Sequence, residues 1–534
     1  MHPLSRRCYS HLESGFRRLS QIPYRKGIYH SHFRRYQSTD SSSADSFSSD
    51  VDFKDEPPRA AAIVVGGGPA GIAAVGNFLE IFSGGKIIWI DKSFAGGMIP
   101  QYLDPLPSYC TAGDYVRFAQ TLPTLARLWT APFSKNSVKT LQRLDQDKPC
   151  QLSYVGNMLK SLTTRLQNHD RVQAVTGAAT LLRREWTVTV DDFTSSIPGL
   201  TQLTFRSKIV VLCTGTKPSI PALPVHVSQW PVYTGFSQER LSQALPANRP
   251  ITMAVIGSGH SAVHVLRNLV GLASTTHPHL RIRWITRTPN FTYSEHVADS
   301  DHGPVILHKY DGLTYETADY ARTQLDGDAL HTSEAGQFIE RVLLPTLPAQ
   351  PSPSSALRAK DLSWASRQAE LEKHALAAAL HDVDHAIQAI GFVRTRAPEI
   401  RPALDADAVP AGGKPRTLAF DSRTGSFYPS GGDRTKVIGL FGAGAAFPEV
   451  VPTPEMANKP RVGVWWFMDF LKRVAPAWVR ATATGTFPKE FVEQRKSWWG
   501  GPRERPENLH KWKEQMQEGE NEEQQGQKSW DQML

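Results

Sequence analysis

The chain has 534 residues, of which 40% are hydrophobic and 21% charged, and its formal net charge is +9. This length is too great for one hydrophobic core, so two or three domains are expected, and the composition is ordinary for a globular protein. No apolar run approaches the roughly 20 residues that span a bilayer, so no integral membrane segment is predicted.

Most of the positive charge lies at the N-terminus. Between Met1 and Thr39, eight Lys and Arg residues stand against the single acid Glu13, which gives this stretch a net charge of +7. The stretch is rich in serine and lacks the continuous apolar run of a secretory signal, as is typical of a mitochondrial transit peptide. We predict a transit peptide over 1–36, a flexible linker over 37–57 and a mitochondrial matrix location. The alternative is a disordered basic tail on a cytosolic protein. Because the charge is concentrated there, no nucleic-acid partner is expected.

A first glycine-rich turn, Gly66-Gly67-Gly68-Pro69-Ala70-Gly71, follows the apolar run Ala62 to Val65, which predicts a buried parallel strand. Gly66 permits a tight turn, Gly68 lets the backbone approach a pyrophosphate, and Gly71 lets the next helix pack on the strand. A second apolar run ends in Asp91, 20 residues after Gly71, where an acid accepts hydrogen bonds from a ribose. The unit therefore predicts a dinucleotide site.

A second turn of the same kind, Gly257-Ser258-Gly259-His260-Ser261-Ala262, lies about 190 residues further on. It follows the apolar run Thr252 to Ile256, and Ala262 is small enough for close helix packing. The next apolar run ends in Thr286-Arg287 without an acid, so a 2′-phosphate there would meet a guanidinium. This site is predicted to prefer NADPH over NADH. The alternative for Arg287 is a solvated arginine at a strand end.

Three later motifs complete a resemblance to a known family. They are Val210 to Pro218 with its Thr214-Gly215 pair, Asp384 to Phe392 with Gly391, and Val437 to Ala445. In this order, and with the two glycine turns, the chain resembles the two-dinucleotide-binding-domain flavoproteins. These include the pyridine nucleotide-disulfide oxidoreductases and the flavin monooxygenases. The resemblance covers roughly residues 58–480. It departs from the family at Ala445, where an acid usually contacts the ribityl chain.

The resemblance implies an α/β fold, in which an FAD-binding Rossmann-like domain carries an inserted NAD(P)H-binding Rossmann-like domain. The FAD-binding domain is expected at 58–240 and 396–480, the inserted domain at 241–395, and a polar, partly disordered C-terminal tail at 481–534. FAD contacts are expected from Gly66, Gly68, Pro69, Ala70, Gly71, Asp91, Lys92, Gly97, Met98, Gly215, Gly442, Gly444 and Ala445. NADPH contacts are expected from Gly257, Gly259, His260, Ser261, Ala262, Arg287 and Gly391.

The cysteines and histidines narrow the chemistry. The chain has four cysteines: Cys8, Cys110, Cys150 and Cys213. None of them forms a C-x-x-C or C-x4-C pair that could relay electrons from flavin to a disulfide, so no disulfide-relay partner is expected. His260 and His264 have a spacing that suits a metal, but no third ligand is evident and no metal site is predicted. The sequence also lacks the Gly-x-Ser-x-Gly elbow of hydrolases and the P-loop of ATPases.

Three interpretations fit these residues, and catalytic residues are not assigned. The main one is an FAD-dependent NAD(P)H oxidoreductase that passes hydride equivalents from NADPH through flavin to a small molecule or oxygen. The first alternative is a flavin-dependent N- or S-hydroxylating monooxygenase, which the second glycine turn and the partial match of Asp384 to Phe392 to N-hydroxylases favour. The second alternative is a flavin-bound protein without turnover, at which Ala445 hints. The stretch His308 to Leu325 lies where the family places substrate-contacting segments, and it contains His308, Tyr310, Tyr315 and Tyr320. These side chains are expected to line a pocket; the alternative is that they pack in an aromatic core.

Overall fold

A computed structural model describes residues 57–101, 106–130, 135–183, 186–192, 202–297, 305–307, 312–347, 358–401, 418–430, 436–451 and 459–488. The chain divides into two units, Met1–Asp55 and Glu56–Leu534. The predicted transit peptide, nearly all of the linker and most of the predicted C-terminal tail lie outside the described residues.

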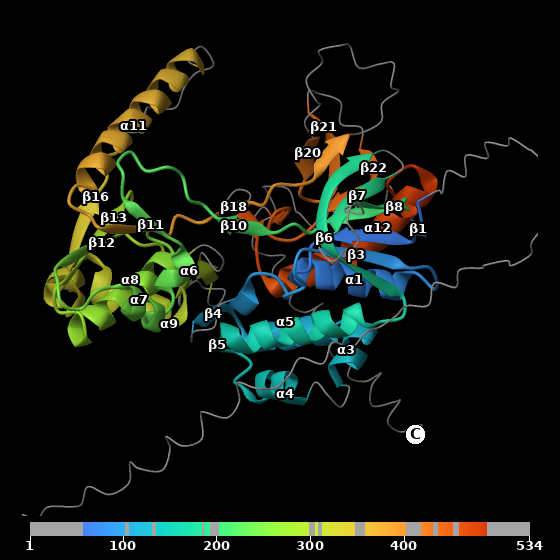
Figure 1. The fold of residues 1–534 in the computed structure, drawn as a ribbon, viewed down its shortest axis with the longest axis horizontal. Coiled ribbons are helices and arrows are strands. Elements are labelled where there is room, and N and C mark those ends of the chain that lie inside the picture. The colour runs from blue at the N-terminus through green and yellow to red at the C-terminus, as the bar shows by residue number, and fades with distance from the viewer. Residues whose placement is uncertain are drawn as a thin grey trace, which may run out of the picture. The chain divides into compact units, whose positions relative to one another are not determined.

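The first domain is built on a sheet with a parallel centre. Its strands run in the order β6-β3-β2-β9-β22, and neighbouring strands are parallel (Figure 1). They are β2 (Ala62–Val65), β3 (Ile87–Asp91), β6 (Val172–Arg183), β9 (Val210–Leu212) and β22 (Val437–Gly442). The side chains of β2 are buried throughout, as expected of a strand covered on both faces. The strands predicted before and after the first glycine turn are confirmed.

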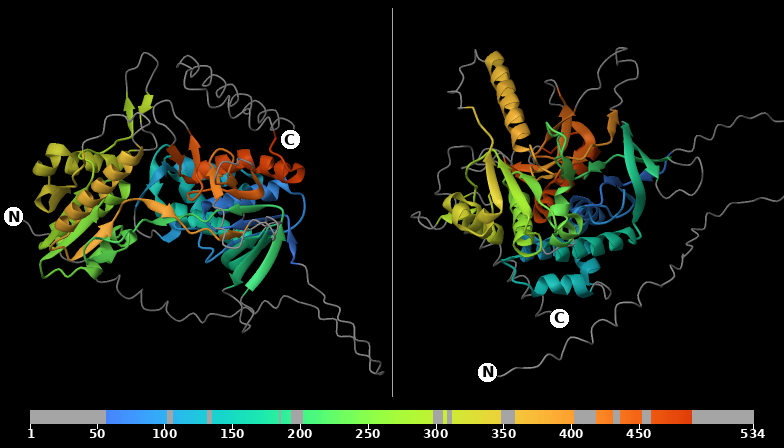
Figure 2. Two further views of the ribbon diagram at one scale, coloured as in Figure 1. Left: turned by 90° about the horizontal axis from the view of Figure 1, so that it is seen from above. Right: turned by 60° about the vertical axis from the view of Figure 1, so that its left-hand side comes forward.

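Helices cover one face of this sheet. Phe78 of the first helix, Trp89 of β3 and Trp478 of the last helix are buried in one apolar cluster. Figures 1 and 2 show the first and last helices, blue and red, on the same side of the sheet. The helices of this layer are α1 (Pro69–Ile81), α2 (Ala112–Gln120), α3 (Pro123–Thr130), α4 (Lys135–Arg143), α5 (Leu152–Gln167) and α12 (Val464–Thr484).

Antiparallel strands extend the same sheet at both edges. The second half of β6 pairs with β7 (Thr187–Asp192), which pairs with β8 (Gln202–Ser207), and these three strands form an antiparallel ribbon. Phe205 and Phe427 contribute to the apolar cluster on the sheet face opposite the helices. The remaining strands of this sheet are β1 (Arg59–Ala60), β19 (Glu399–Arg401), β20 (Leu418–Asp421) and β21 (Ser426–Pro429).

The second domain contains a five-stranded parallel sheet in the order β11-β17-β12-β13-β16. Its strands are β11 (Ser228–Trp230), β12 (Ile251–Ile256), β13 (Leu280–Thr286), β16 (Ile339–Leu343) and β17 (His385–Gln388). Helix α8 (His260–Thr275) packs on one face, while Ala379 and Leu380 at the end of α11 (Arg358–Ala379) pack on the other. The shorter helices are α6 (Val232–Gly235), α7 (Gln238–Ala244), α9 (Tyr315–Tyr320), a π-helical turn (Ala321–Leu325), α10 (Gly327–Thr332) and a 3-10 turn (Ala335–Gln337).

The second domain is inserted into the first. The chain leaves the first sheet after β9 and returns to it at β19, and the two crossing segments pair as β10 (Thr216–Pro218) with β18 (Phe392–Arg394). This is the α/β fold with an inserted domain that the sequence predicted. Strand β11 already belongs to the inserted sheet, so that sheet begins before residue 241, where the sequence placed its boundary. Short pairs complete the structure: β4 (Pro107–Thr111) with β5 (Pro149–Gln151), β14 (Glu295–Val297) with β15 (Val305–Leu307), and β23 (Glu449–Val451) with β24 (Lys459–Arg461), beside the 3-10 turn Ile99–Gln101.

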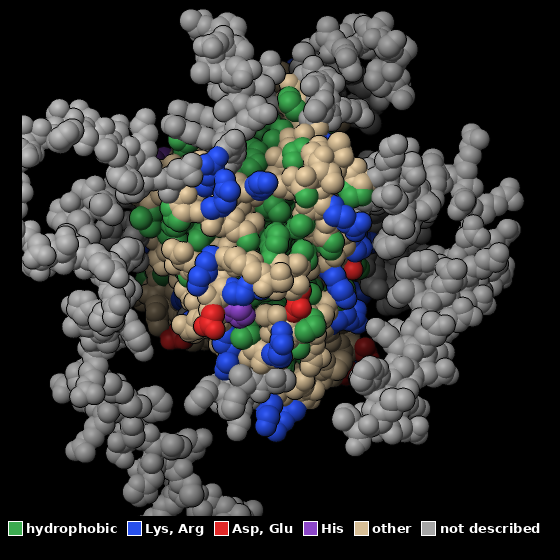
Figure 3. Space-filling model, turned by 90° about the vertical axis from the view of Figure 1, so that its right-hand side faces the viewer, with side chains coloured by type: hydrophobic (Ala, Val, Ile, Leu, Met, Phe, Trp, Pro, Cys, Tyr) green, Lys and Arg blue, Asp and Glu red, His purple; other side chains and the backbone are tan. Residues whose placement is uncertain are grey.

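The surface carries scattered basic side chains. On the face shown in Figure 3, Lys and Arg border a central apolar area and do not form one continuous stripe, such as nucleic-acid-binding surfaces present. Of the helices that the structure describes, none is long and apolar enough to cross a membrane.

Candidate functional site: two dinucleotide cradles and a cavity

The first glycine turn lies at the carboxyl end of β2 and allows no side chain at two positions. Gly66 has a φ of +120°, and a Cβ there would lie 2.1 Å from the carbonyl oxygen of Cys213. A Cβ on Gly71 would lie 1.9 Å from the carbonyl oxygen of Gly66. The predicted steric roles, a tight turn at Gly66 and close helix packing at Gly71, are therefore confirmed.

Gly68 faces open space at the start of α1. A Cβ on it would meet only the Cα of Gly97, at 3.6 Å, and no side chain caps this helix. The first N–H groups of a helix have no partner within the helix and carry its positive dipole end, which suits a phosphate. Nearby, in the loop after β9, the buried Thr214 Oγ1 has no hydrogen-bond partner among the described residues. We call the open space beside Gly68 and the N-terminus of α1 the first cradle. This space and the unpaired hydroxyl both fit FAD.

Asp91 orders the turn from the end of β3. Its carboxylate accepts hydrogen bonds from the backbone N–H groups of Gly67 at 2.7 Å, Ser93 at 2.9 Å and Phe94 at 2.7 Å. The bonds from Ser93 and Phe94 go to Oδ1 and only that from Gly67 goes to Oδ2, so Oδ2 keeps an acceptor position for a ligand hydroxyl. Asp91 therefore has a structural task that the sequence did not predict, and the ribose contact remains a prediction.

The other predicted FAD residues gather around this turn. A Cβ on Gly97 would lie 2.9 Å from the Cα of Gly68, and one on Gly444 would lie 2.5 Å from the Cβ of Ala70. Gly442 ends β22 beside Leu212 of β9, on the sheet edge that also carries Gly66. The predicted residues around them differ in exposure: Pro69, Met98, Gly215 and Ala445 are partly buried, and Lys92 is exposed.

The second glycine turn repeats this geometry. Gly257 has a φ of +127°, and a Cβ there would lie 2.4 Å from the carbonyl oxygen of Ala389. Gly259 is the N-cap of α8, and a Cβ on it would meet nothing within 4 Å. Ala262 is fully buried under the turn, where the first site has Gly71. Gly391, in the return crossover, has a φ of +97° and also faces open space. This open cradle fits a second dinucleotide.

A tryptophan supports each turn in the same way. The Trp89 indole N–H donates to the carbonyl of Gly66 at 2.9 Å, and the Trp284 indole N–H donates to the carbonyl of Gly257 at 2.8 Å. Both tryptophans are fully buried, each on the strand after its turn. Sequence reasoning missed this pair, although the two strands do share a Trp-Ile step before their last residues. The bond fixes the first carbonyl of the turn and so the entry to the cradle.

Arg287 lies next to the second turn, one residue beyond β13. Its side chain is 72% exposed and forms an ion pair with Glu372, at 2.9 Å, whose side chain is only 19% exposed. The exposure leaves the guanidinium accessible to a 2′-phosphate, but Glu372 competes for it. A second guanidinium, that of Arg341, stacks on Trp284 and donates to the carbonyl of Thr288, which orders the loop after β13. The role of Arg287 in selecting NADPH remains a prediction.

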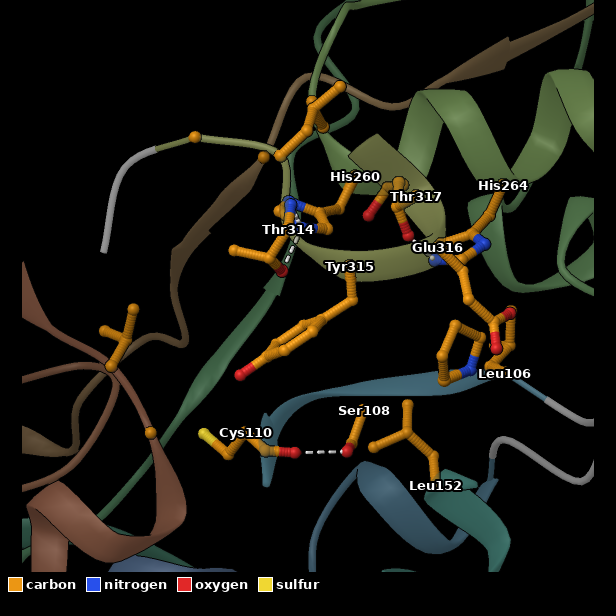
Figure 4. A pocket seen from close by; sticks show the side chains of 18 of the residues that line it. Leu106, Ser108, Cys110, Leu152, His260, His264, Thr314, Tyr315, Glu316 and Thr317 are labelled. Atoms are coloured by element: carbon orange, nitrogen blue, oxygen red, sulfur yellow. Dashed lines mark hydrogen bonds between the residues drawn. The ribbon is translucent and has the colours of Figure 1, made fainter. Parts of the chain in front are cut away.

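A cavity of about 830 Å³ lies where the two domains face each other (Figure 4). Ser258 to Ser261 of the second turn line one side. The opposite side is lined by residues of the first domain: Ile99, Ser108, Cys110 and Val462 to Val464. The segment 312–317, at the start of α9, supplies a third wall. These segments are far apart in sequence, and no sequence signal connected them.

The two histidines of α8 are neutral and tied to this third wall. His260 Nε2 accepts from the Thr314 N–H at 3.1 Å and also contacts Thr314 Oγ1, and His264 Nε2 lies 3.2 Å from Thr317 Oγ1. Burial lowers the pKa of both histidines to about 4. In the described part of the chain, no cluster of three potential metal ligands was found.

The cysteine that lines the cavity is not a thiolate. Burial, with a smaller contribution from Asp114, raises the pKa of Cys110 to about 12. The neighbouring Tyr115 is buried, and desolvation raises its pKa well above the usual value. The Ser108 hydroxyl donates to the carbonyl of Cys110. This side of the cavity therefore offers neutral hydroxyl and thiol groups, and a nucleophilic role for Cys110 at neutral pH is not supported.

The fold and the two open cradles define a flavoprotein with two dinucleotide-binding domains. Comparison with known proteins agrees. The family model for L-lysine 6-monooxygenase/L-ornithine 5-monooxygenase matches residues 152–299. The monooxygenase AgnR1 of Paecilomyces divaricatus is 34% identical over 433 residues, which are 80% of this chain and 99% of that protein. The chain belongs to the family of this monooxygenase. It is an FAD-dependent NAD(P)H oxidoreductase whose cofactors are FAD and NADPH.

Solved structures with lower similarity were also found. L-lysine 6-monooxygenase from Pseudomonas syringae is 13% identical, with a TM-score of 0.42, over 79% of this chain and 99% of that one. The ornithine N-hydroxylase of Kutzneria sp. 744 is 14% identical, with a TM-score of 0.41, over 79% and 99%. The cadaverine monooxygenase DfoA of Erwinia amylovora is 13% identical, with a TM-score of 0.41, over 80% and 96%.

Proposed function

We propose that this protein is an FAD- and NADPH-dependent hydroxylating monooxygenase, whose acceptor is a nitrogen or sulfur atom of a small molecule. The observation that carries the proposal is the cavity between the two domains, which the second glycine turn lines directly and which Ile99, two residues after Gly97, lines from the first domain. The matched family model and the relative AgnR1 support the oxygenating chemistry over a simple reductase.

The second cradle would hold the NADPH pyrophosphate at Gly259 and the N-terminus of α8, and its neighbours Ser258 and Ser261 line the cavity. The first cradle would hold the FAD pyrophosphate at Gly68 and the N-terminus of α1, with Asp91 ordering the turn.

The cavity walls exclude water and offer neutral polar contacts. The apolar part of the walls includes Leu106, Leu152, Phe236 and Val464. Removing bulk water protects a reactive oxygenating centre from unproductive decay. Reduced flavin supplies the chemistry of dioxygen activation, in which one oxygen atom enters the substrate and the other becomes water. The residues of the chain bind, orient and shield, and the two histidines of the wall are neutral at neutral pH because burial lowers their pKa to about 4.

The proposal is tested by following where the oxygen goes. Purified holoprotein is mixed with NADPH and air, with and without methyl phenyl sulfide, L-lysine or L-ornithine. NADPH loss, peroxide release and oxygenated product are measured together, with isotopic dioxygen as the label. We expect at least one probe to acquire a labelled oxygen atom while peroxide release falls. Peroxide equal to the NADPH consumed, with no labelled product from any probe, would support a reductase or oxidase instead.

A further inference from the structure

One side chain in the cavity occupies a strained position. Tyr315 is the first residue of α9 and has a φ of +50°, in the left-handed region that non-glycine residues rarely adopt. The residue is 44% exposed, so little burial within the fold compensates for the strain. Such residues persist only when the surroundings hold them, and they cluster at functional sites.

The surroundings of Tyr315 do hold it. On its N-terminal side, Thr314 is fixed by two contacts with His260, both at 3.1 Å. The preceding residue, Leu313, exchanges backbone hydrogen bonds with Thr292 and Ser294 at 2.8 and 2.9 Å. On the C-terminal side, Thr317 contacts His264 at 3.2 Å. The residue is therefore presented by a segment anchored on the helix that begins at the NADPH turn.

The ring of Tyr315 is presented to the cavity. Figure 4 shows it between the His260–Thr314 pair on one side and Cys110 with Ser108 on the other. The wall around it is apolar or neutral: Leu106 and Leu152 contribute aliphatic surface, and His260 is uncharged because burial lowers its pKa to about 4.

Charge is present at only one described position of the cavity wall. Of the described lining residues, Glu316 is the one Asp, Glu, Lys or Arg; its side chain is 71% exposed and lies 3.8 Å from Arg267. A free amino acid or a diamine brings two or three charges that need desolvated partners. An uncharged aromatic molecule instead gains from stacking on a rigid ring.

We propose that Tyr315 is a specificity-determining residue, and that it selects an uncharged acceptor with an aromatic body over a charged amino acid or diamine. The inference rests on the proposed monooxygenase function. For a thioether probe, one oxygen atom of dioxygen is added to sulfur to give the sulfoxide, and the other leaves as water. NADPH supplies two electrons, and one proton is taken from solvent, which leaves NADP+.

The test compares Tyr315→Ala, Tyr315→Phe and Tyr315→Gly with the control Tyr233→Ala. Tyr233 is 39% exposed on α6 and does not line the cavity, so the control removes the same exposed ring elsewhere. Methyl phenyl sulfide and L-ornithine are the probes. Affinity is measured from the change of the visible flavin spectrum of the oxidised holoprotein, and KM and kcat from sulfoxide formation.

We expect methyl phenyl sulfide to bind and to be oxygenated in preference to L-ornithine. Tyr315→Ala and Tyr315→Gly raise its Kd and KM about tenfold with a smaller change in kcat, while Tyr315→Phe retains most of the affinity. Tyr315→Gly also unfolds at the same or a higher temperature than the parent, since glycine relieves the backbone strain. If the Tyr315 ring served only stability, its removal in Tyr315→Gly would lower the unfolding temperature.

Two results would overturn the inference while leaving the monooxygenase assignment intact. One is preferential binding and hydroxylation of L-ornithine. The other is sulfoxide formation in which the Tyr315 variants behave as Tyr233→Ala does. Consumption of NADPH with equivalent peroxide and no labelled product from either probe would instead remove the proposed function, and the inference with it.

Discussion

The sequence and the structure predict different sizes for the preference for NADPH over NADH that Arg287 provides. From the sequence alone, charge-assisted hydrogen bonds of about 1.5–3 kcal/mol each predict a preference over NADH of roughly tenfold to a hundredfold. In the structure the guanidinium is 72% exposed and paired with Glu372. Exposure favours the lower figure, about 1.5 kcal/mol, and breaking an exposed ion pair costs about 0.2–1 kcal/mol. The net gain of about 0.5–1.3 kcal/mol corresponds to a preference of roughly twofold to ninefold.

Three variants separate these terms. Arg287→Ala abolishes the preference, because only NADPH carries the 2′-phosphate. Glu372→Gln raises it toward tenfold or more, because the guanidinium no longer has a competing carboxylate. Arg281→Ala removes an equal charge from an exposed site on β13, the strand that precedes Arg287, and leaves the preference unchanged. The assay is anaerobic stopped-flow flavin reduction with each nucleotide at several concentrations. An equal loss for NADPH and NADH in Arg287→Ala, or no gain in Glu372→Gln, would refute the reasoning.

Four further outcomes are expected. The Gly68→Val protein loses FAD on purification, because the valine side chain fills the space beside α1. The control Gly84→Val, at an open loop position, keeps FAD. Full flavin content in a folded Gly68→Val protein would count against the first cradle. Trp284→Phe lowers the free energy of unfolding by about 1–3 kcal/mol in denaturant titrations, since a partly buried carbonyl loses its donor. Burial holds the pKa of His260 at about 4, below its usual 6.5, so the unfolded chain binds the proton more readily. The free energy of unfolding therefore falls as the pH drops from about 6.5 to 4, and His260→Gln flattens that slope. Met1 to Asp50 fused to a fluorescent protein directs it to mitochondria; cytosolic fluorescence would contradict the transit peptide.

The local geometry of both cradles was predictable because the steric rules act within a few residues. A tight turn after a buried strand leaves no space for a Cβ at Gly66 or Gly257, and this requirement is visible in the spacing of the glycines. The strand and helix patterns around them follow from runs of apolar residues. The inserted arrangement required more than spacing, and it followed from the resemblance to the flavoprotein family.

The cavity was not predictable from the sequence. Ser108, Leu152 and Tyr315 line one cavity only after two domains have folded and faced each other, and no periodic pattern links their positions. The same applies to the ion pair of Arg287 with Glu372, which joins a strand end to a helix 85 residues further along the chain. The indole hydrogen bonds of Trp89 and Trp284 were predictable only in part. The equivalent positions of the two tryptophans are visible in the sequence, but the carbonyl groups that accept their hydrogen bonds are not.

The central claim is that NADPH in the second cradle reduces FAD in the first, and Gly259→Val tests it most directly. A Cβ at Gly259 meets nothing within 4 Å, so the variant folds, while its side chain enters the space assigned to the NADPH pyrophosphate. In an anaerobic stopped-flow experiment, NADPH should bleach the flavin of the parent protein. The variant should retain its flavin and be bleached by dithionite but not by NADPH. Bleaching of Gly259→Val by NADPH at the parent rate, or no bleaching of the parent, would contradict the account.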